Sequence, residues 1–155
     1  MAVEARHSAF LRGARKQSPA PQPFDAPLGL NKVFTLAAPF IVSCPARNGE
    51  LPLIAFPALK LVGSGSVRTG GSILLETEGG EVGFGECDYF AAWVGISGPV
   101  FVPVERVHGR FRVGVPKGFH GQSYVVITRK KGSIADEDVV AGPAVVEVEG
   151  VSGMD

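Results

Sequence analysis

The chain has 155 residues, and 45% of them are hydrophobic, which is enough apolar material for one domain of ordinary size. Equal numbers of basic and acidic residues, 15 of each, give a formal net charge of zero and leave no global attraction for nucleic acid or an anionic membrane. No apolar run reaches the roughly 18 to 20 residues that cross a bilayer. We therefore expect no nucleic-acid partner and no membrane partner.

The N-terminal segment, residues 1–14, is predicted to be a helix, because apolar side chains from Val3 to Ala14 recur at helical spacing. A helix this short is marginal in water and needs a surface to pack against. Within it, Glu4 and His7 lie three positions apart and so share one face. These two residues are the candidate metal ligands.

Residues 15–27 form a predicted linker, because Pro19, Pro21 and Pro23 fix the backbone and remove hydrogen-bond donors. The remainder is predicted to be one β-domain over 28–150, followed by a tail at 151–155. Its short apolar runs are separated by glycine and proline and show no helical pattern between them. The expected strands are 32–44, 56–62, 72–77, 89–96, 100–104, 110–115, 123–128 and 144–149.

The order and length of these strands favour an all-β fold, an antiparallel immunoglobulin-like β-sandwich with a short N-terminal helix. A small barrel is the alternative. The strand at 110–115 alternates cleanly, with Phe111 and Val113 on one face and Arg110 and Arg112 on the other. Such alternation predicts a sheet with one side in water.

The strand at 89–96 carries Tyr89 and Trp93 among apolar neighbours. One interpretation makes these two aromatic residues a stacking surface for carbohydrate. Because the flanking residues are also apolar, core packing with burial on both faces is the favoured alternative.

Cys44 and Cys87 are too few to define a disulfide scaffold. They are a candidate pair for one bridge, which would close a loop of about forty residues and stabilise the fold by roughly 3 to 4 kcal/mol. The alternative is two buried reduced thiols, and the sequence leaves both open.

Several segments occur in the order found in the C-terminal part of fungal ferritin-like proteins associated with stress and desiccation, and the chain resembles that family. The resemblance rests on Glu4-Ala5-Arg6-His7, Pro39-Phe40-Ile41-Val42-Ser43-Cys44-Pro45, Phe101-Val102-Pro103-Val104, Tyr124-Val125-Val126-Ile127-Thr128 and Val140-Ala141-Gly142-Pro143-Ala144. It implies that residues 1–14 are the end of the last di-iron helix and that the rest is a C-terminal β-sandwich domain. It also implies iron or manganese in a full-length relative.

A complete ferritin-like site takes about six ligands from four helices, and Glu4 with His7 supplies two of them. We therefore expect no cofactor and no catalytic residue in the isolated chain, which would be a truncated, non-catalytic accessory domain. One alternative is a module that binds cell-wall polysaccharide. Another is metal binding after self-association through the N-terminal helix. The resemblance implies secretion, but no secretion signal is recognised here, so no compartment is assigned.

Overall fold

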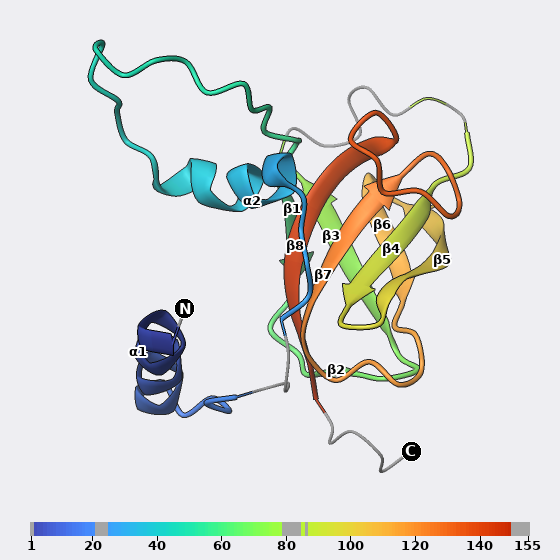
Figure 1. Cartoon of the computed structure of the whole chain (residues 1–155). Helices are drawn as coiled ribbons and strands as arrows, with labels where there is room; N and C mark the ends of the chain where they lie inside the picture. Colours follow the sequence, from blue (N-terminus) through green and yellow to red (C-terminus); the bar gives the residue numbers. More distant parts are fainter. Residues whose placement is uncertain (1, 21–24, 79–84, 86, 150–155) are drawn as a thin grey trace.

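The computed structural model describes the chain except for residues 1, 21–24, 79–84, 86 and 150–155. Figure 1 shows a curled β body, one helix on the body's flank and a second helix apart from it. The elements are α1 (Ala2–Ala14), α2 (Leu30–Ala37), the 3₁₀ turn η1 (Ala38–Phe40), β1 (Leu59–Val62), β2 (Val67–Arg68), β3 (Ser72–Thr77), β4 (Phe90–Gly95), β5 (Gly98–Val107), β6 (Arg110–Gly114), β7 (Gly121–Thr128) and β8 (Val139–Glu149). No described helix is long and apolar enough to span a membrane.

The eight described strands form one sheet in the order β1-β3-β6-β5-β4-β7-β8-β2. The long strand β5 connects its two halves, because residues 98–103 pair with β4 while residues 104–107 pair with β6. All pairs are antiparallel except β2 with β8. The sheet therefore turns over along β5 into a half-barrel, an all-β and sandwich-like fold. The finer immunoglobulin-like likeness stays a prediction.

The curl brings the two ends of the sheet together at Gly142 of β8. Its backbone N–H donates a hydrogen bond to the carbonyl of Pro57, 2.9 Å away, just before β1. The φ of Gly142 is +101°, and a Cβ there would lie 2.8 Å from the carbonyl oxygen of Val125. Only glycine fits this close approach without a shift of the backbone.

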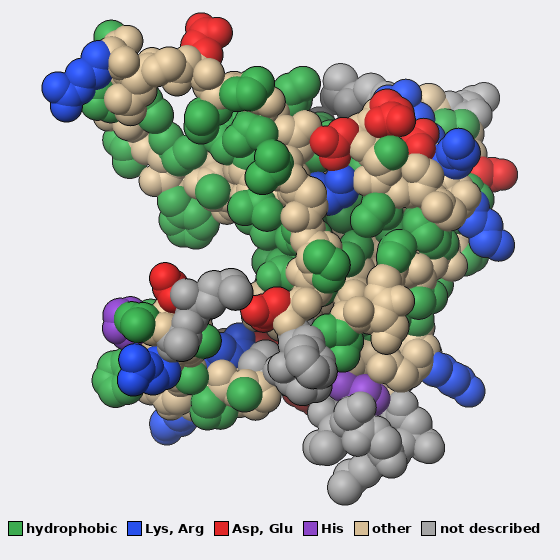
Figure 2. Space-filling model, in the orientation of Figure 1, with side chains coloured by type: hydrophobic (Ala, Val, Ile, Leu, Met, Phe, Trp, Pro, Cys, Tyr) green, Lys and Arg blue, Asp and Glu red, His purple; other side chains and the backbone are tan. Residues whose placement is uncertain are grey.

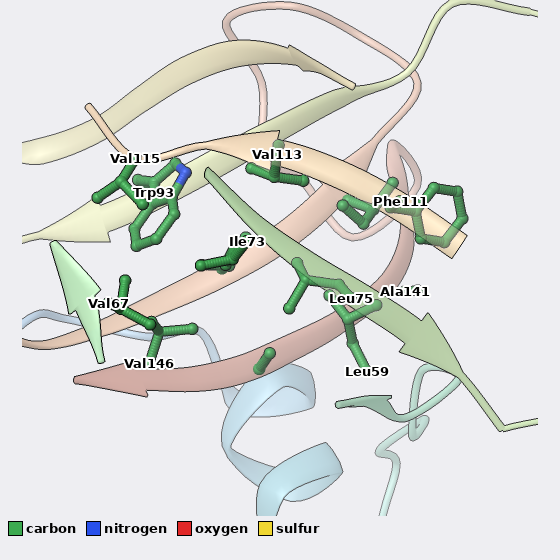
Figure 3. Close-up of a cluster of buried hydrophobic side chains, with 14 of the residues drawn as sticks. Leu59, Val67, Ile73, Leu75, Trp93, Phe111, Val113, Val115, Ala141 and Val146 are labelled. Atoms are coloured by element: carbon green, nitrogen blue, oxygen red, sulfur yellow. The ribbon is translucent and has the colours of Figure 1, made fainter. Parts of the chain in front are cut away.

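The hydrophobic core lies inside the half-barrel, where side chains from both halves of the sheet meet (Figure 3). Leu75, Trp93 and Val113 are fully buried there. The rings of Trp93 and Phe119 meet edge to face with their centroids 5.8 Å apart. Aromatic contacts of this geometry add to the stabilisation from burial.

A second cluster covers the outer face of β4, β7 and β8, where Ala92 and Val94 pack with Val126. Ala26, which precedes α2, is buried against this cluster. Strand β4 is therefore buried on both faces, since Trp93 belongs to the inner core, and this confirms the prediction for 89–96.

Most of the predicted strands are present, and Ser72–Thr77 has the expected bounds. Strand β8 begins five residues earlier than predicted, at Val139, and the two-residue strand β2 was not predicted. The strand predicted at 32–44 is wrong. Its residues form part of α2, then η1, and then a segment without regular structure.

The error at 32–44 has a local cause. Val33, Thr35 and other residues of high strand propensity suggested β structure, but strand propensity depends strongly on context. The Thr35 hydroxyl donates to the carbonyl of Asn31, 2.7 Å away, a contact within one helical turn. Pro39 lies near the start of η1, where its missing N–H costs nothing.

The packing of the core predicts that two adjacent leucines of β3 contribute differently to the free energy of unfolding. Leu75 is fully buried inside the half-barrel, whereas Leu74 is half-buried on the opposite face. Leu75→Ala should lower the free energy of unfolding by roughly 2–5 kcal/mol, and Leu74→Ala should cost clearly less. Urea unfolding followed by Trp93 fluorescence measures both. Equal losses would contradict the assignment of the inner face.

Candidate functional site: an apolar surface over helix α2

Helix α2 has its polar side chains turned inward. Lys32 and Thr35 are only 3% and 5% exposed, whereas Leu30 is 74% exposed and Val33 is 49% exposed. A surface helix of a globular protein normally directs its apolar stripe to the core and its charges to water. The packing of α2 on the β body is thus the reverse of the usual one.

An ion pair holds the polar side of α2 in place. Lys32 Nζ donates to Asp136 Oδ1 at 2.7 Å, and Asn31 Nδ2 donates to the other oxygen of the same carboxylate at 2.9 Å. The ammonium group also lies 5.7 Å from the centre of the Phe56 ring, within reach of a cation–π contact. The buried charge therefore has a carboxylate partner and an aromatic face.

Asp136 belongs to the turn between β7 and β8, and that turn is braced from within. The Ser133 hydroxyl donates to the Asp138 carboxylate and accepts the backbone N–H of Ala135. The backbone N–H of Asp138 donates to the carbonyl of Ala135 at 2.9 Å. The carboxylate that receives Lys32 is thus presented by a turn with its own hydrogen bonds.

The chain that returns from α2 to the β body is tied to the same polar side. The backbone N–H of Ile54 donates to Asn31 Oδ1 at 3.0 Å, and that of Phe56 donates to Thr35 Oγ1 at 2.9 Å. Together with the Lys32–Asp136 pair, these bonds fix the rotation of α2 about its axis. Its apolar side consequently faces away from the body.

The result is an exposed apolar surface on α2, η1 and the loop that follows. Figure 2 shows hydrophobic side chains gathered over this part of the molecule, with a hollow between it and α1. We call it the α2 surface, and it consists of Leu30, Val33, Phe40, Ile41, Val42, Leu51 and Ile54.

The α2 surface is large for a protein of this size. Val42 is 98% exposed and Phe40 is 85% exposed. If the roughly 200 Å² of an aromatic residue is taken as an upper value for each, the seven exposed fractions correspond to at most on the order of 900 Å², spread over α2, η1 and the loop that follows. The largest apolar patch on a typical monomer is roughly 300–600 Å². A surface of this size is typical of an interface.

The two predicted metal ligands lie on α1, away from the α2 surface. Glu4 and His7 are both exposed on this helix. Within the described part of the chain, no group of three or more His, Cys, Asp or Glu residues could hold a metal ion. Metal binding by Glu4 and His7 stays a prediction.

The two cysteines are arranged in neither of the ways that the sequence left open. Cys44 and Cys87 are both exposed and free, so they form no disulfide and are not buried thiols. Cys44 lies in the loop after η1, which extends away from the β body (Figure 1), and Cys87 lies just before β4.

Tyr89 and Trp93 do not form a carbohydrate-stacking surface, and that interpretation is wrong. Trp93 is fully buried and Tyr89 is 4% exposed, because both point into the half-barrel. Burial raises the pKa of the Tyr89 hydroxyl, and its hydrogen bond with the Cys87 thiol raises it further. The alternative of core packing is confirmed.

The sequence interpretation missed the α2 surface altogether. Leu30, Val33, Phe34 and Ala37 recur at helical spacing, and this signal could have identified α2. It could not have shown which side faces the body, because a helical pattern alone predicts the apolar side inward.

Comparison with known proteins gives one partial similarity. The chain is 42% identical over 60 residues to Protein rds1 of Schizosaccharomyces pombe, and the match covers 39% of this chain and 15% of that protein. No protein-family profile matches the chain. The chain thus spans only a small part of the curated relative that it matches.

The anchor of α2 can be tested at Asp136. Asp136→Asn removes the charge that faces buried Lys32, and because the carboxylate is itself 45% exposed, the loss should be about 1–3 kcal/mol. In this variant the backbone amides of residues 30–40 should exchange their hydrogens faster. Glu137→Gln, an exposed neighbour with the same change of charge, is the matched control and should leave exchange unchanged. Equal effects of the two substitutions would show that the pair does not hold α2.

Proposed function

We propose that this chain is a non-catalytic accessory domain that acts by docking through the α2 surface. The observation that carries the proposal is the reversed packing of α2. Buried polar groups must have partners, and here Lys32, Asn31 and Thr35 all have them. The fold thus stabilises polar contacts inside and keeps the apolar side available for a partner.

The wider role that we propose is that of a structural domain of a ferritin-like, stress-related protein. Two observations support it: the resemblance of the ordered segments, and the match to Protein rds1, of which this chain covers only 15%. In a longer protein of this kind, an accessory domain needs a surface to dock on its neighbours. The α2 surface has the apolar character and the area that such docking requires.

The structure weakens one of the two alternative functions and leaves the other open. The proposal of a polysaccharide-binding module has lost its aromatic platform, since Tyr89 and Trp93 belong to the core. The proposal of metal binding on assembly keeps its residues accessible, because Glu4 and His7 are exposed on α1. It requires that several copies bring their α1 helices together.

Binding of the dye anilinonaphthalene sulfonate tests whether the α2 surface is available in solution, because the dye's fluorescence rises on exposed apolar surface. The double variant Phe40→Ser/Val42→Ser should show a clearly smaller rise when the dye is added to dilute protein, because these two residues have the largest exposed fractions of the α2 surface. Val100→Ser/Val145→Ser is the matched control, since these residues are 42% and 48% exposed on strands of the β body. Its dye fluorescence should stay near that of the unchanged chain.

Circular dichroism and the urea midpoint should be the same for both double variants, which excludes partial unfolding as the cause. A dye signal that falls equally in both variants, or in neither, would contradict a docking role for the α2 surface.

A further inference from the structure

Helix α1 is a second element whose apolar side chains are exposed. Its large apolar side chains are well exposed, with Val3 at 51%, Phe10 at 76% and Leu11 at 61%. An isolated helix of 13 residues is marginal in water. Helix α1 therefore needs an apolar surface to pack against.

The α2 surface of the same copy does not cover it. Arg12 of α1 forms an ion pair with Glu147 of β8, with Nη2 and Oε1 2.7 Å apart. Lys32 of α2 pairs with Asp136, in the turn that precedes β8. Since a strand rises about 3.3 Å per residue, roughly 25 Å of β8 separates these two anchors. Figure 2 shows the hollow that remains between α1 and the α2 surface.

We propose that the α2 surface receives helix α1 of a second copy of this chain, and that the exchange is reciprocal. This inference rests on the proposed docking role of the α2 surface. A two-fold axis that lies outside the molecule, in front of β8 and perpendicular to it at a level between the Arg12–Glu147 and Lys32–Asp136 pairs, sets each end of β8 in one copy against the opposite end in the other. It brings α1 of each copy to the α2 surface of the other, so that one kind of contact occurs twice and closes the assembly.

The areas fit such a dimer. The three large apolar residues of α1 add about 400 Å² to the roughly 900 Å² of the α2 surface, on the exposed fractions of each residue. Full burial on both copies would remove about 2,500 Å², and stable interfaces bury roughly 1,200–2,000 Å² in total. Half to four fifths of the available apolar area is therefore sufficient.

Light scattering coupled to size exclusion tests the proposal on the full chain over about a hundredfold range of concentration. The unchanged chain should move from its monomer mass of 16.2 kDa to twice that mass. Phe10→Gln/Leu11→Gln on α1 and Phe40→Ser/Val42→Ser on the α2 surface should each raise the dissociation constant by about tenfold or more. Ile96→Ser/Val100→Ser, two residues that are 46% and 42% exposed at the β4–β5 turn away from β8, should leave it unchanged.

Mixing the two disrupted variants identifies the contact. The α2-surface variant still has an intact α1, and the α1 variant still has an intact α2 surface. If α1 packs on the α2 surface of the other copy, an equal mixture regains one of the two contacts and associates more strongly than either variant alone.

Several outcomes would overturn the proposal. A monomer at every concentration would do so, and so would a dimer that the α1 variant leaves intact, which would indicate that two α2 surfaces pack on each other. A failed mixture would exclude the exchange. If the chain stays monomeric while the dye still reports the α2 surface, the docking role stands and its occupant is another partner.

Discussion

The buried ammonium group of Lys32 is the constraint on which the arrangement of this protein depends. A charge removed from water must be paired, because an isolated one costs several kcal/mol. Its partner, Asp136, lies 104 residues further along the chain and close to the start of β8. Because Asn31 binds the same carboxylate, two adjacent residues of α2 face one turn of the β body. The direction of every other side chain of α2 follows from that contact.

Strand β8 connects the anchor of α2, the closure of the sheet and the anchor of α1. Its first residues follow the turn that holds Asp136, Gly142 brings the two ends of the sheet together, and Glu147 receives Arg12 of α1. The β body thus acts as a rigid spacer between α1 and α2. A core with fully buried Leu75 and Trp93 gives that spacer the stability to hold both helices apart.

The sequence alone predicts the strands correctly where the local pattern of side chains agrees with the tertiary environment. Strand β3 was predicted at its observed bounds as a short apolar run. Strand β6 was predicted with one extra residue at its end, because its side chains alternate between a buried and a solvated face. Strand β4 was predicted as buried on both faces because polar residues are missing from it. These are consequences of side-chain period and composition.

Prediction failed where a distant contact decides the outcome. Thr35 and Lys32 can be buried because the backbone N–H of Phe56 and the carboxylate of Asp136 form hydrogen bonds with them. A local sequence pattern cannot predict a bonding partner that lies so far along the chain. The two-residue strand β2 is too short to carry a period, and its pairing with β8 is parallel and non-local. The candidate site is therefore the part of the molecule that sequence reasoning was least able to find.

The reversed orientation of α2 has an energetic implication. Helix α2 itself contributes Leu30 and Val33 to the α2 surface, with exposed fractions that correspond to about 250 Å². At about 25 cal/mol per Å², this leaves roughly 6 kcal/mol of potential stabilisation unrealised, as an upper limit. That is comparable with the 5–15 kcal/mol net stability typical of a whole domain. If α2 served only the β body, its apolar side would gain more by facing inward. Phe40 in η1 and Val42 in the loop after it are still more exposed than the α2 residues. Burial against a second body would recover the stabilisation that both sets forgo, and association would then be part of how the sequence specifies its structure.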